Sequence, residues 1–196
     1  VGLPQASVSQ AKKVDVWTWQ DGIEDAYHTY IDLDDDEWVE NMEIPVPDQS
    51  PIPEKWREMT EFNEKTGTLI IWSKVDRCNW RKAKTLYRHS ENLIGRMYRN
   101  WLHADAGNRH VDISLIVYNE ENKEIEDPWE FHPNDPLYLM ENTNVELPEG
   151  VPDPMFEQYG DPIERKYRII QPNGEETEET VKITFSITKP ETRRII

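Results

Sequence analysis

The chain has 196 residues and a formal net charge of −17, with 36% hydrophobic and 31% charged residues. Eight tryptophans and eight tyrosines supply large side chains for a core, so the composition predicts a globular protein and excludes a disordered one. The acidic excess makes nucleic acid an unfavourable partner, because it repels a phosphate backbone. No apolar stretch has the length of a bilayer span, so we expect no membrane segment.

The single cysteine, Cys78, cannot form a disulfide within the chain, and this favours a cytoplasmic location. No signal-peptide pattern is present. The sequence starts at Val1, in what reads as a glycine turn, and stops at Ile196 without a recognisable end of a fold. We therefore expect this chain to be a piece of a longer protein.

The first elements are predicted by turn residues and apolar periodicity. Pro4 follows a glycine turn and suits the first position of a helix, which we expect over residues 5–11. Alternation over 14–18 predicts a strand. The pair Asp21-Gly22 is a hairpin signal, and a return strand is expected over 24–33.

The acidic run 34–37 has two interpretations, a metal-binding loop or the start of a helix. We favour the helix start, because carboxylates suit a helix N-terminus and the glycine and distal glutamate of a calcium loop are missing. Four prolines within 42–53 predict an extended connector, and a short helix is expected over 54–62.

The stretch 65–77 is the feature around which we expect the fold to be organised. Gly67 forms a turn before the run Leu69-Ile70-Ile71-Trp72, which is too short for a helix and predicts a buried strand. A long helix is expected over 79–103, because apolar residues recur there at spacings of three and four. Its opposite face carries the only concentrated basic surface: Arg81, Lys82, Lys84, Arg88, Arg96 and Arg99.

That basic face either contacts phosphate or nucleic acid, or is a solvated surface that offsets an acidic body, and we favour the solvated surface. Residues 127–162 contain seven prolines and predict irregular loops. Asn173-Gly174 is a strong hairpin signal. Further strands are expected over 110–118, 123–126, 166–170 and 180–188. We place the domain division within or just after the long helix, giving domains 1–104 and 105–196.

No complete catalytic constellation is present in the sequence. The five histidines lack the spacing of a zinc motif. A nucleophile elbow and a phosphate loop of the Lys-Ser/Thr type are absent as sequence motifs. An acidic chain contains many carboxylate pairs by chance, so none can be singled out for glycoside hydrolysis. We assign no catalytic residue and no metal ligand to this chain.

Two glycine-containing pieces carry the main functional signal. Gly2 and Leu3 lead into a helix N-terminus, where free N–H groups and the helix dipole favour anions. Gly67 and Thr68 open what we expect to be a central strand, with a hydroxyl at the sheet edge. Each piece is a weak signal alone, and their order along the chain is more informative.

The order of glycine motif, helix, strand, hairpin, connector and Gly67-Thr68 resembles the second half of a GHKL ATP-binding domain. That superfamily includes the gyrase B subunit, MutL proteins, ninety-kilodalton heat-shock chaperones, sensor histidine kinases and MORC proteins. The runs 72–77, 94–99 and 134–138 look like bacterial Hsp90-like or MORC-like ATP-binding proteins. The resemblance covers most of the chain.

The resemblance implies an α+β fold: part of the GHKL (Bergerat) α/β sandwich with a mixed sheet, then a long helix and a small α/β region like an S5-like transducer domain. It implies that Gly2 and Leu3 offer backbone N–H groups to phosphates, and that Gly67 and Thr68 belong to the adenine pocket, with Thr68 hydrogen-bonding directly or through water. The cofactors implied are ATP and Mg²⁺.

Several parts of the superfamily pattern have no match in this chain. These are the Glu/Asn helix that activates water and holds Mg²⁺, and the Asp-Gly motif that reads adenine; we expect both upstream of Val1. The lysine that senses the terminal phosphate cannot be placed on Lys74, Lys82 or Lys84. We therefore expect this segment alone to be inactive.

The function implied is ATP binding and hydrolysis by the full-length protein, coupled to a conformational change in a homodimer. The alternative is a non-enzymatic module that binds another protein through a tryptophan-rich surface and the acidic body, with the glycines forming plain turns. A nucleic-acid contact through the basic helix face is a third and weaker hypothesis.

Overall fold

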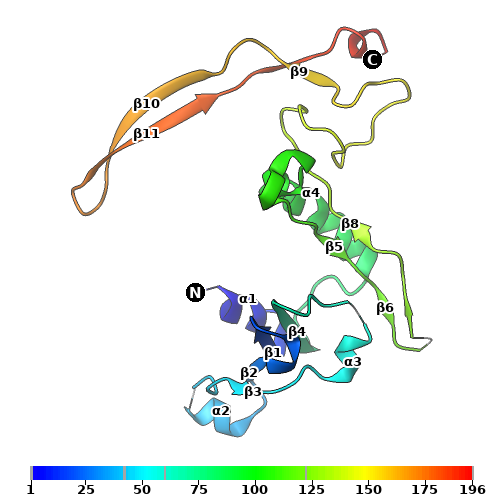
Figure 1. Cartoon of the computed structure of the whole chain (residues 1–196), viewed down its shortest axis with the longest axis vertical. Helices are drawn as coiled ribbons and strands as arrows, with labels where there is room; N and C mark the ends of the chain where they lie inside the picture. Colours follow the sequence, from blue (N-terminus) through cyan, green and yellow to red (C-terminus); the bar gives the residue numbers. More distant parts are fainter. Residues whose placement is uncertain (1, 42, 60, 122, 196) are drawn as a thin grey trace. The chain divides into compact units, whose positions relative to one another are not determined.

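The computed structural model describes residues 2–41, 43–59, 61–121 and 123–195. The fold is mixed α+β, with several small antiparallel sheets and few helices (Figure 1). Contacts group the chain into two compact units: Val1–Arg81 with Tyr118–Ile125, and Lys82–Val117 with Glu126–Ile196. The domain division between 104 and 105, which we place at the end of the long helix, stays a prediction.

A four-stranded sheet forms the centre of the first unit, in the order β3-β2-β1-β4. Its strands are β1 (Ala11–Trp19), β2 (Tyr27–Asp32), β3 (Asp48–Gln49) and β4 (Gly67–Val75). Every pair of neighbours in this sheet is antiparallel, so the predicted mixed sheet is wrong for the described residues. β4 lies at the end of this order, so the predicted central position of the Gly67-Thr68 strand is also wrong.

The helices of the first unit are shorter than predicted. α1 covers Leu3–Val8 and ends before Ala11, because β1 begins there and pairs with Val75 of β4. Strand pairing thus overrides the helical preference of a small-residue segment. The other helices of this unit are η1 (Ile23–Asp25), α2 (Asp36–Asn41) and α3 (Glu54–Arg57); α2 and α3 lie within or next to the predicted helical segments.

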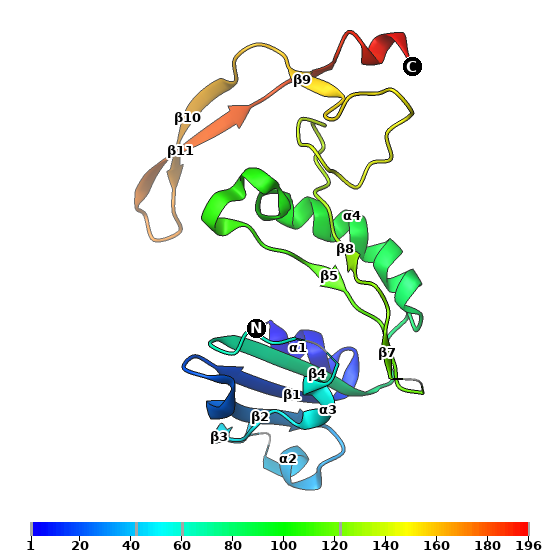
Figure 2. The same cartoon turned by 45° about the vertical axis from the view of Figure 1, so that its right-hand side comes forward.

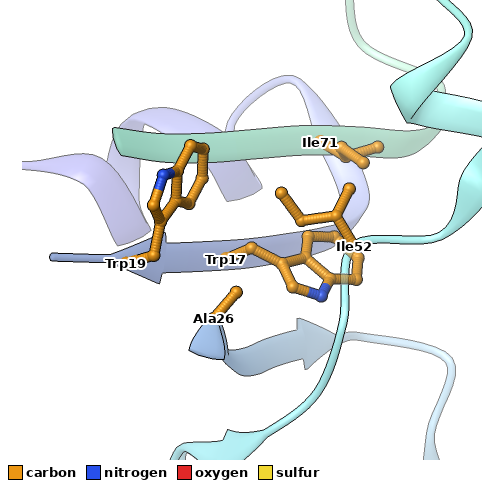
Figure 3. Close-up of a cluster of buried hydrophobic side chains, with 5 residues drawn as sticks. All are labelled: Trp17, Trp19, Ala26, Ile52 and Ile71. Carbon is orange, nitrogen blue, oxygen red and sulfur yellow. The ribbon is translucent and has the colours of Figure 1, made fainter. Parts of the chain in front are cut away.

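The two faces of the sheet have different coverings. On one face, Trp17, Trp19 and Ile71 pack with Ala26 and Ile52, as Figure 3 shows. The alternate residues of β1 and β4 point to the opposite face, because successive side chains of a strand alternate. α1 lies on that opposite face, as Figure 2 also shows.

The run Leu69-Ile70-Ile71-Trp72 is only partly buried, which corrects the prediction of a buried strand. Ile71 is buried, whereas Ile70 and Trp72 are 41% and 44% exposed. The alternation explains the difference, since Ile71 faces the core and its two neighbours face the side that α1 covers only in part. β4 therefore behaves as a half-exposed strand.

The second unit is built on the long helix α4 (Ala83–Leu102), which confirms the predicted helix with a later start. The hairpin of β10 (Ile163–Ile170) and β11 (Glu176–Ile183) confirms the Asn173-Gly174 turn signal, and Gly174 has the positive φ of 86° that such a turn needs. The remaining elements of this unit are η2 (Ala104–Arg109), β5 (Ser114–Leu115), β8 (Trp129–Glu130), β9 (Phe156–Gln158), β12 (Ser186–Thr188) and η3 (Thr192–Arg194).

The predicted strand 110–118 is mostly irregular. Only Ser114–Leu115 pairs with β8 in the second unit. In the first unit, β6 (Tyr118–Asn119) pairs with β7 (Glu124–Ile125), as the predicted turn and return strand require. The predicted strand 180–188 is also interrupted, because β11 ends at Ile183 and β12 pairs instead with β9.

Candidate functional site

The first glycine motif stands at the start of α1. Gly2 is the N-cap, with a φ of 144° that favours glycine, and the first turn of α1 carries no acidic residue. Leu3 lines an apolar cavity of about 220 Å³ between α1 and the sheet, together with Pro4, Val14 and Val16. The helix start therefore lies over β1, with no carboxylate in its own first turn to repel an anion.

The second glycine motif stands at the start of β4. The hydroxyls of Thr68 and Thr18 are 3.2 Å apart, and the Thr18 hydroxyl also donates to the carbonyl of Gly67 over 3.3 Å. A Cβ atom on Gly67 would overlap the ring of Trp19, so a core contact already requires glycine at this position. Gly67 thus has a packing role whether or not a ligand binds.

The structure places the two motifs on the same face of the sheet. Val14, Val16 and Thr18 alternate along β1, and their partners on β4 are Trp72, Ile70 and Thr68. These six side chains share one face, and Val14 and Val16 also line the cavity beside Leu3. Thr68 does not line that cavity, so the structure brings the motifs to one surface without joining them in one pocket.

A part-buried hydrogen bond connects the helix of the first motif to the strand of the second. The indole Nε1 of Trp72 donates to the hydroxyl of Ser7 over 2.9 Å, and Ser7 is fully buried. Arg77 adds a second connection, since its Nη1 donates to the carbonyl of Val8 at the end of α1 over 2.6 Å. Neither contact follows a local pattern, and sequence reasoning missed both.

Lys74 is neutralised within the first unit. Its Nζ lies 3.0 Å from Asp32 and 3.3 Å from Asp34, and Lys12 lies 3.0 Å from Asp34. The hydrogen bond to Asp32 raises the pKa of Lys74. These ion pairs give Lys74 a local role and do not direct it toward Gly2 or Thr68.

The face that carries the two glycine motifs does not by itself enclose a nucleotide or hold Mg²⁺. The cavity beside Leu3 is smaller than the roughly 300–1,000 Å³ typical of ligand pockets. Within the described ranges, no group of three or more His, Cys, Asp or Glu side chains is placed to hold a metal ion. We therefore assign no step to a metal.

Comparison with known proteins gave no match: no protein-family model, no curated protein and no solved structure matches this chain. None of the helices in the described part of the chain combines the length and apolarity needed to cross a bilayer.

Proposed function

We propose that this chain is the later part of a GHKL-type ATP-binding domain, followed by the start of an S5-like transducer region. In this proposal the full-length protein binds and hydrolyses ATP with Mg²⁺ and couples the nucleotide state to a conformational change in a homodimer. Hydrolysis requires residues outside this chain. The observation that carries the proposal is that Leu3 and Thr68 lie on the same face of one antiparallel sheet.

The chemistry of that face supports the proposal. The N–H groups of Gly2 and Leu3 at the start of α1 suit a phosphate, because the first turn carries no acidic side chain, whereas Pro4 has no N–H to offer. An adenine ring needs an apolar surface with few polar partners, and Ile70 offers such a surface two residues from the Thr68 hydroxyl. The Ser7–Trp72 hydrogen bond holds the helix and the strand together, so the two parts keep one arrangement.

The test is a calorimetric titration of ATP with Mg²⁺ into the natural full-length protein that contains this chain. We expect binding, and we expect Thr68→Val to weaken it about tenfold, because valine keeps the shape of threonine but replaces its hydroxyl with a methyl group. Thr180→Val on the exposed β11 is the matched control and should bind as the unchanged protein does. Absence of ATP binding, or unchanged affinity in Thr68→Val, would refute the proposal.

A second candidate is a non-enzymatic module that binds another protein. Exposed apolar side chains on α4 favour it, since Leu93 and Met97 are each 60% exposed and stand four residues apart on one face. The same titration separates the two functions. The module would be supported if the folded full-length protein does not bind ATP and if the Leu93→Ser substitution abolishes binding of a protein partner.

A further inference from the structure

A second cavity lies between the first turns of α4 and strand β8, within the second unit. Its volume is about 450 Å³, and its lining residues are Lys84, Tyr87, Arg88, Trp129, Glu130 and His132. This volume falls inside the range of roughly 300–1,000 Å³ typical of small-molecule sites. The lining combines aromatic rings, cations and one carboxylate, so a matching ligand needs a complementary group for each of the three.

The aromatic wall of this cavity, formed by Tyr87 and Trp129, is held in place by ring packing and a hydrogen bond. The rings of Tyr87 and Trp129 meet edge to face, with centroids 5.5 Å apart, and Tyr87 also packs against Phe131 at 5.0 Å. The hydroxyl of Tyr87 donates to the backbone carbonyl of Glu130 over 2.8 Å. Because these rings are already ordered, binding a ligand against them costs little additional conformational entropy.

Two cations stand beside this wall. Lys84 and Arg88 lie one helical turn apart on α4, and neither makes an ion pair or a side-chain hydrogen bond with the described residues. The first turn of α4 contains no acidic residue, and its N-cap makes no side-chain hydrogen bond. The positive end of a 20-residue helix therefore adds to the two charges. In a chain of net charge −17, this local excess of positive charge indicates an anionic ligand.

Glu130 restricts the ligand further. It lines the cavity from β8, whereas Lys84 and Arg88 line it from α4, and a carboxylate there disfavours a second anionic group. A carboxylate accepts hydrogen bonds from amino groups, such as the exocyclic amino group of a base. The ligand must therefore be anionic at one end, flat and apolar in the middle, and a hydrogen-bond donor at the other end.

We propose that this cavity binds a nucleotide, with the phosphate at Lys84 and Arg88, the base against Trp129 and Tyr87, and an amino group of the base at Glu130. Base stacking on aromatic side chains and cation contacts to phosphate are the usual components of such sites. The nucleotide can be a free mononucleotide or a residue of a single-stranded nucleic acid, since both present the same groups. Its lining residues all belong to the second unit, and none of them is part of the ATP-binding surface proposed in the first unit.

The test is an NMR titration of the ¹⁵N-labelled full chain, following the indole N–H signal of Trp129. The probes are CMP and UMP, which differ in the amino group at position 4 of the ring. We expect CMP to shift the signal and to bind more tightly than UMP, and we expect cytidine, which lacks the phosphate, to bind at least about tenfold more weakly than CMP. No shift of the Trp129 signal with CMP would overturn the proposal.

Substitutions assign each role. Lys84→Gln and Arg88→Gln should each weaken CMP binding about tenfold, whereas Lys182→Gln on the exposed β11 should leave it unchanged. Glu130→Gln should reduce the preference for CMP over UMP. Unchanged affinity in both cation variants, or an unaltered preference in Glu130→Gln, would overturn the proposal.

A short single-stranded oligocytidine distinguishes the two sources of the nucleotide. If the natural ligand is a strand, the oligomer should bind at least about tenfold more tightly than CMP, with an affinity that falls steeply as salt rises. If it is a mononucleotide, the oligomer should bind no more tightly than CMP. Both outcomes support the site, provided that Lys84→Gln weakens the binding.

Discussion

Trp72 donates its indole N–H to the hydroxyl of Ser7 over 2.9 Å, across 65 positions of sequence. Ser7 is fully buried on α1, and Trp72 lies on β4 four residues beyond Thr68. Together with the Arg77–Val8 contact, this bond joins the helix that follows Gly2 to the strand that begins at Gly67. If the first motif moves relative to the second, this hydrogen bond must break, unless α1 and β4 move together.

The Ser7–Trp72 bond should be measurable as a coupling energy. Ser7→Ala leaves the indole N–H without its acceptor, and we expect it to lower the unfolding free energy by about 1 kcal/mol. Combined with Trp72→Phe, it should cost less than the sum of the two single changes. Urea unfolding of the four proteins of this cycle measures the difference. Ser9→Ala combined with Trp72→Phe is the control and should be additive, whereas additivity of the Ser7 pair would contradict the bond.

Gly95 should not tolerate alanine, although it lies inside a helix. An added Cβ would be 2.5 Å from the backbone carbonyl oxygen of His132, and the amide N–H of Asn134 donates to the Gly95 carbonyl over 3.0 Å. Elsewhere in a helix, Gly→Ala stabilises by roughly 1 kcal/mol. Here we expect a loss of roughly 1–3 kcal/mol, because the backbone of residues 132–134 must move away.

Thermal or urea unfolding followed by circular dichroism checks the sign of the Gly95 effect. Asn100→Ala, an exposed change on the same helix, is the control and should be neutral or slightly stabilising. A Gly95→Ala protein that is more stable than the unchanged one would show that the helix and the 132–134 segment do not pack this closely.

Local patterns predicted much of the fold. The alternation of Val14, Val16 and Thr18 located β1, the three- and four-residue spacing located α4, and Asn173-Gly174 located the β10–β11 turn. These signals depend on neighbours along the chain. The position and exposure of β4 could not be obtained in this way, because they depend on which elements pack beside Leu69-Ile70-Ile71-Trp72.

The candidate site shows the same limit. The sequence singled out Gly67 as part of a nucleotide pocket, while the structure also gives it a packing reason in the ring of Trp19. Trp19 precedes Gly67 by 48 positions and pairs with it across two strands, so no local motif joins them. Ser7 and Arg77 were missed for the same reason, since their roles come from contacts between distant segments.

Asp135 should be required for the loop that follows the 131–134 segment. Its buried carboxylate accepts hydrogen bonds from the amides of Leu137, Leu139 and Met140 at 3.0, 2.7 and 3.1 Å. Asp135→Ala leaves three part-buried N–H groups without an acceptor, and we expect a loss of roughly 2–3 kcal/mol in unfolding free energy. Asp135→Asn keeps a carbonyl oxygen and should lose less.

Urea unfolding of both Asp135 variants gives this ranking. Asp161→Ala removes an exposed carboxylate from the same unit and should stay within roughly 0.5 kcal/mol of the unchanged protein. Equal stability of Asp135→Ala and Asp161→Ala would mean that the loop does not depend on this carboxylate.

The ion pairs of Lys74 should make the stability of the first unit depend on pH. Burial raises the pKa of Asp32, but hydrogen bonds from Lys74 and from the amide of Asp34 outweigh it and hold that pKa below the ordinary 3.8. The hydrogen bond from Lys12, assisted by Lys74, lowers the pKa of Asp34 in the same way. Both carboxyl groups therefore bind protons less readily in the folded chain than in the unfolded one.

The sign of the pH effect follows from these pKa shifts. The stabilisation is complete above the ordinary carboxyl value and is lost as the pH falls through the lowered folded values. The raised pKa of Lys74 sets the other limit, since its contribution is complete below 10.5 and is lost as the pH rises through the folded value. Lys74→Gln should thus reduce stability at about pH 7, and this difference should shrink below about pH 3.

Unfolding free energies of Lys74→Gln and the unchanged protein, measured by urea at a series of pH values, test this expectation. Glutamine keeps the Cβ atom at the φ of 53° found at this position, so the backbone strain is the same in both proteins. Lys65→Gln removes an exposed lysine without an ion pair among the described residues and should show no such pH dependence. A Lys74→Gln difference that stays constant into strong acid would contradict the role of the two carboxylates, because protonation must abolish their attraction to the ammonium group.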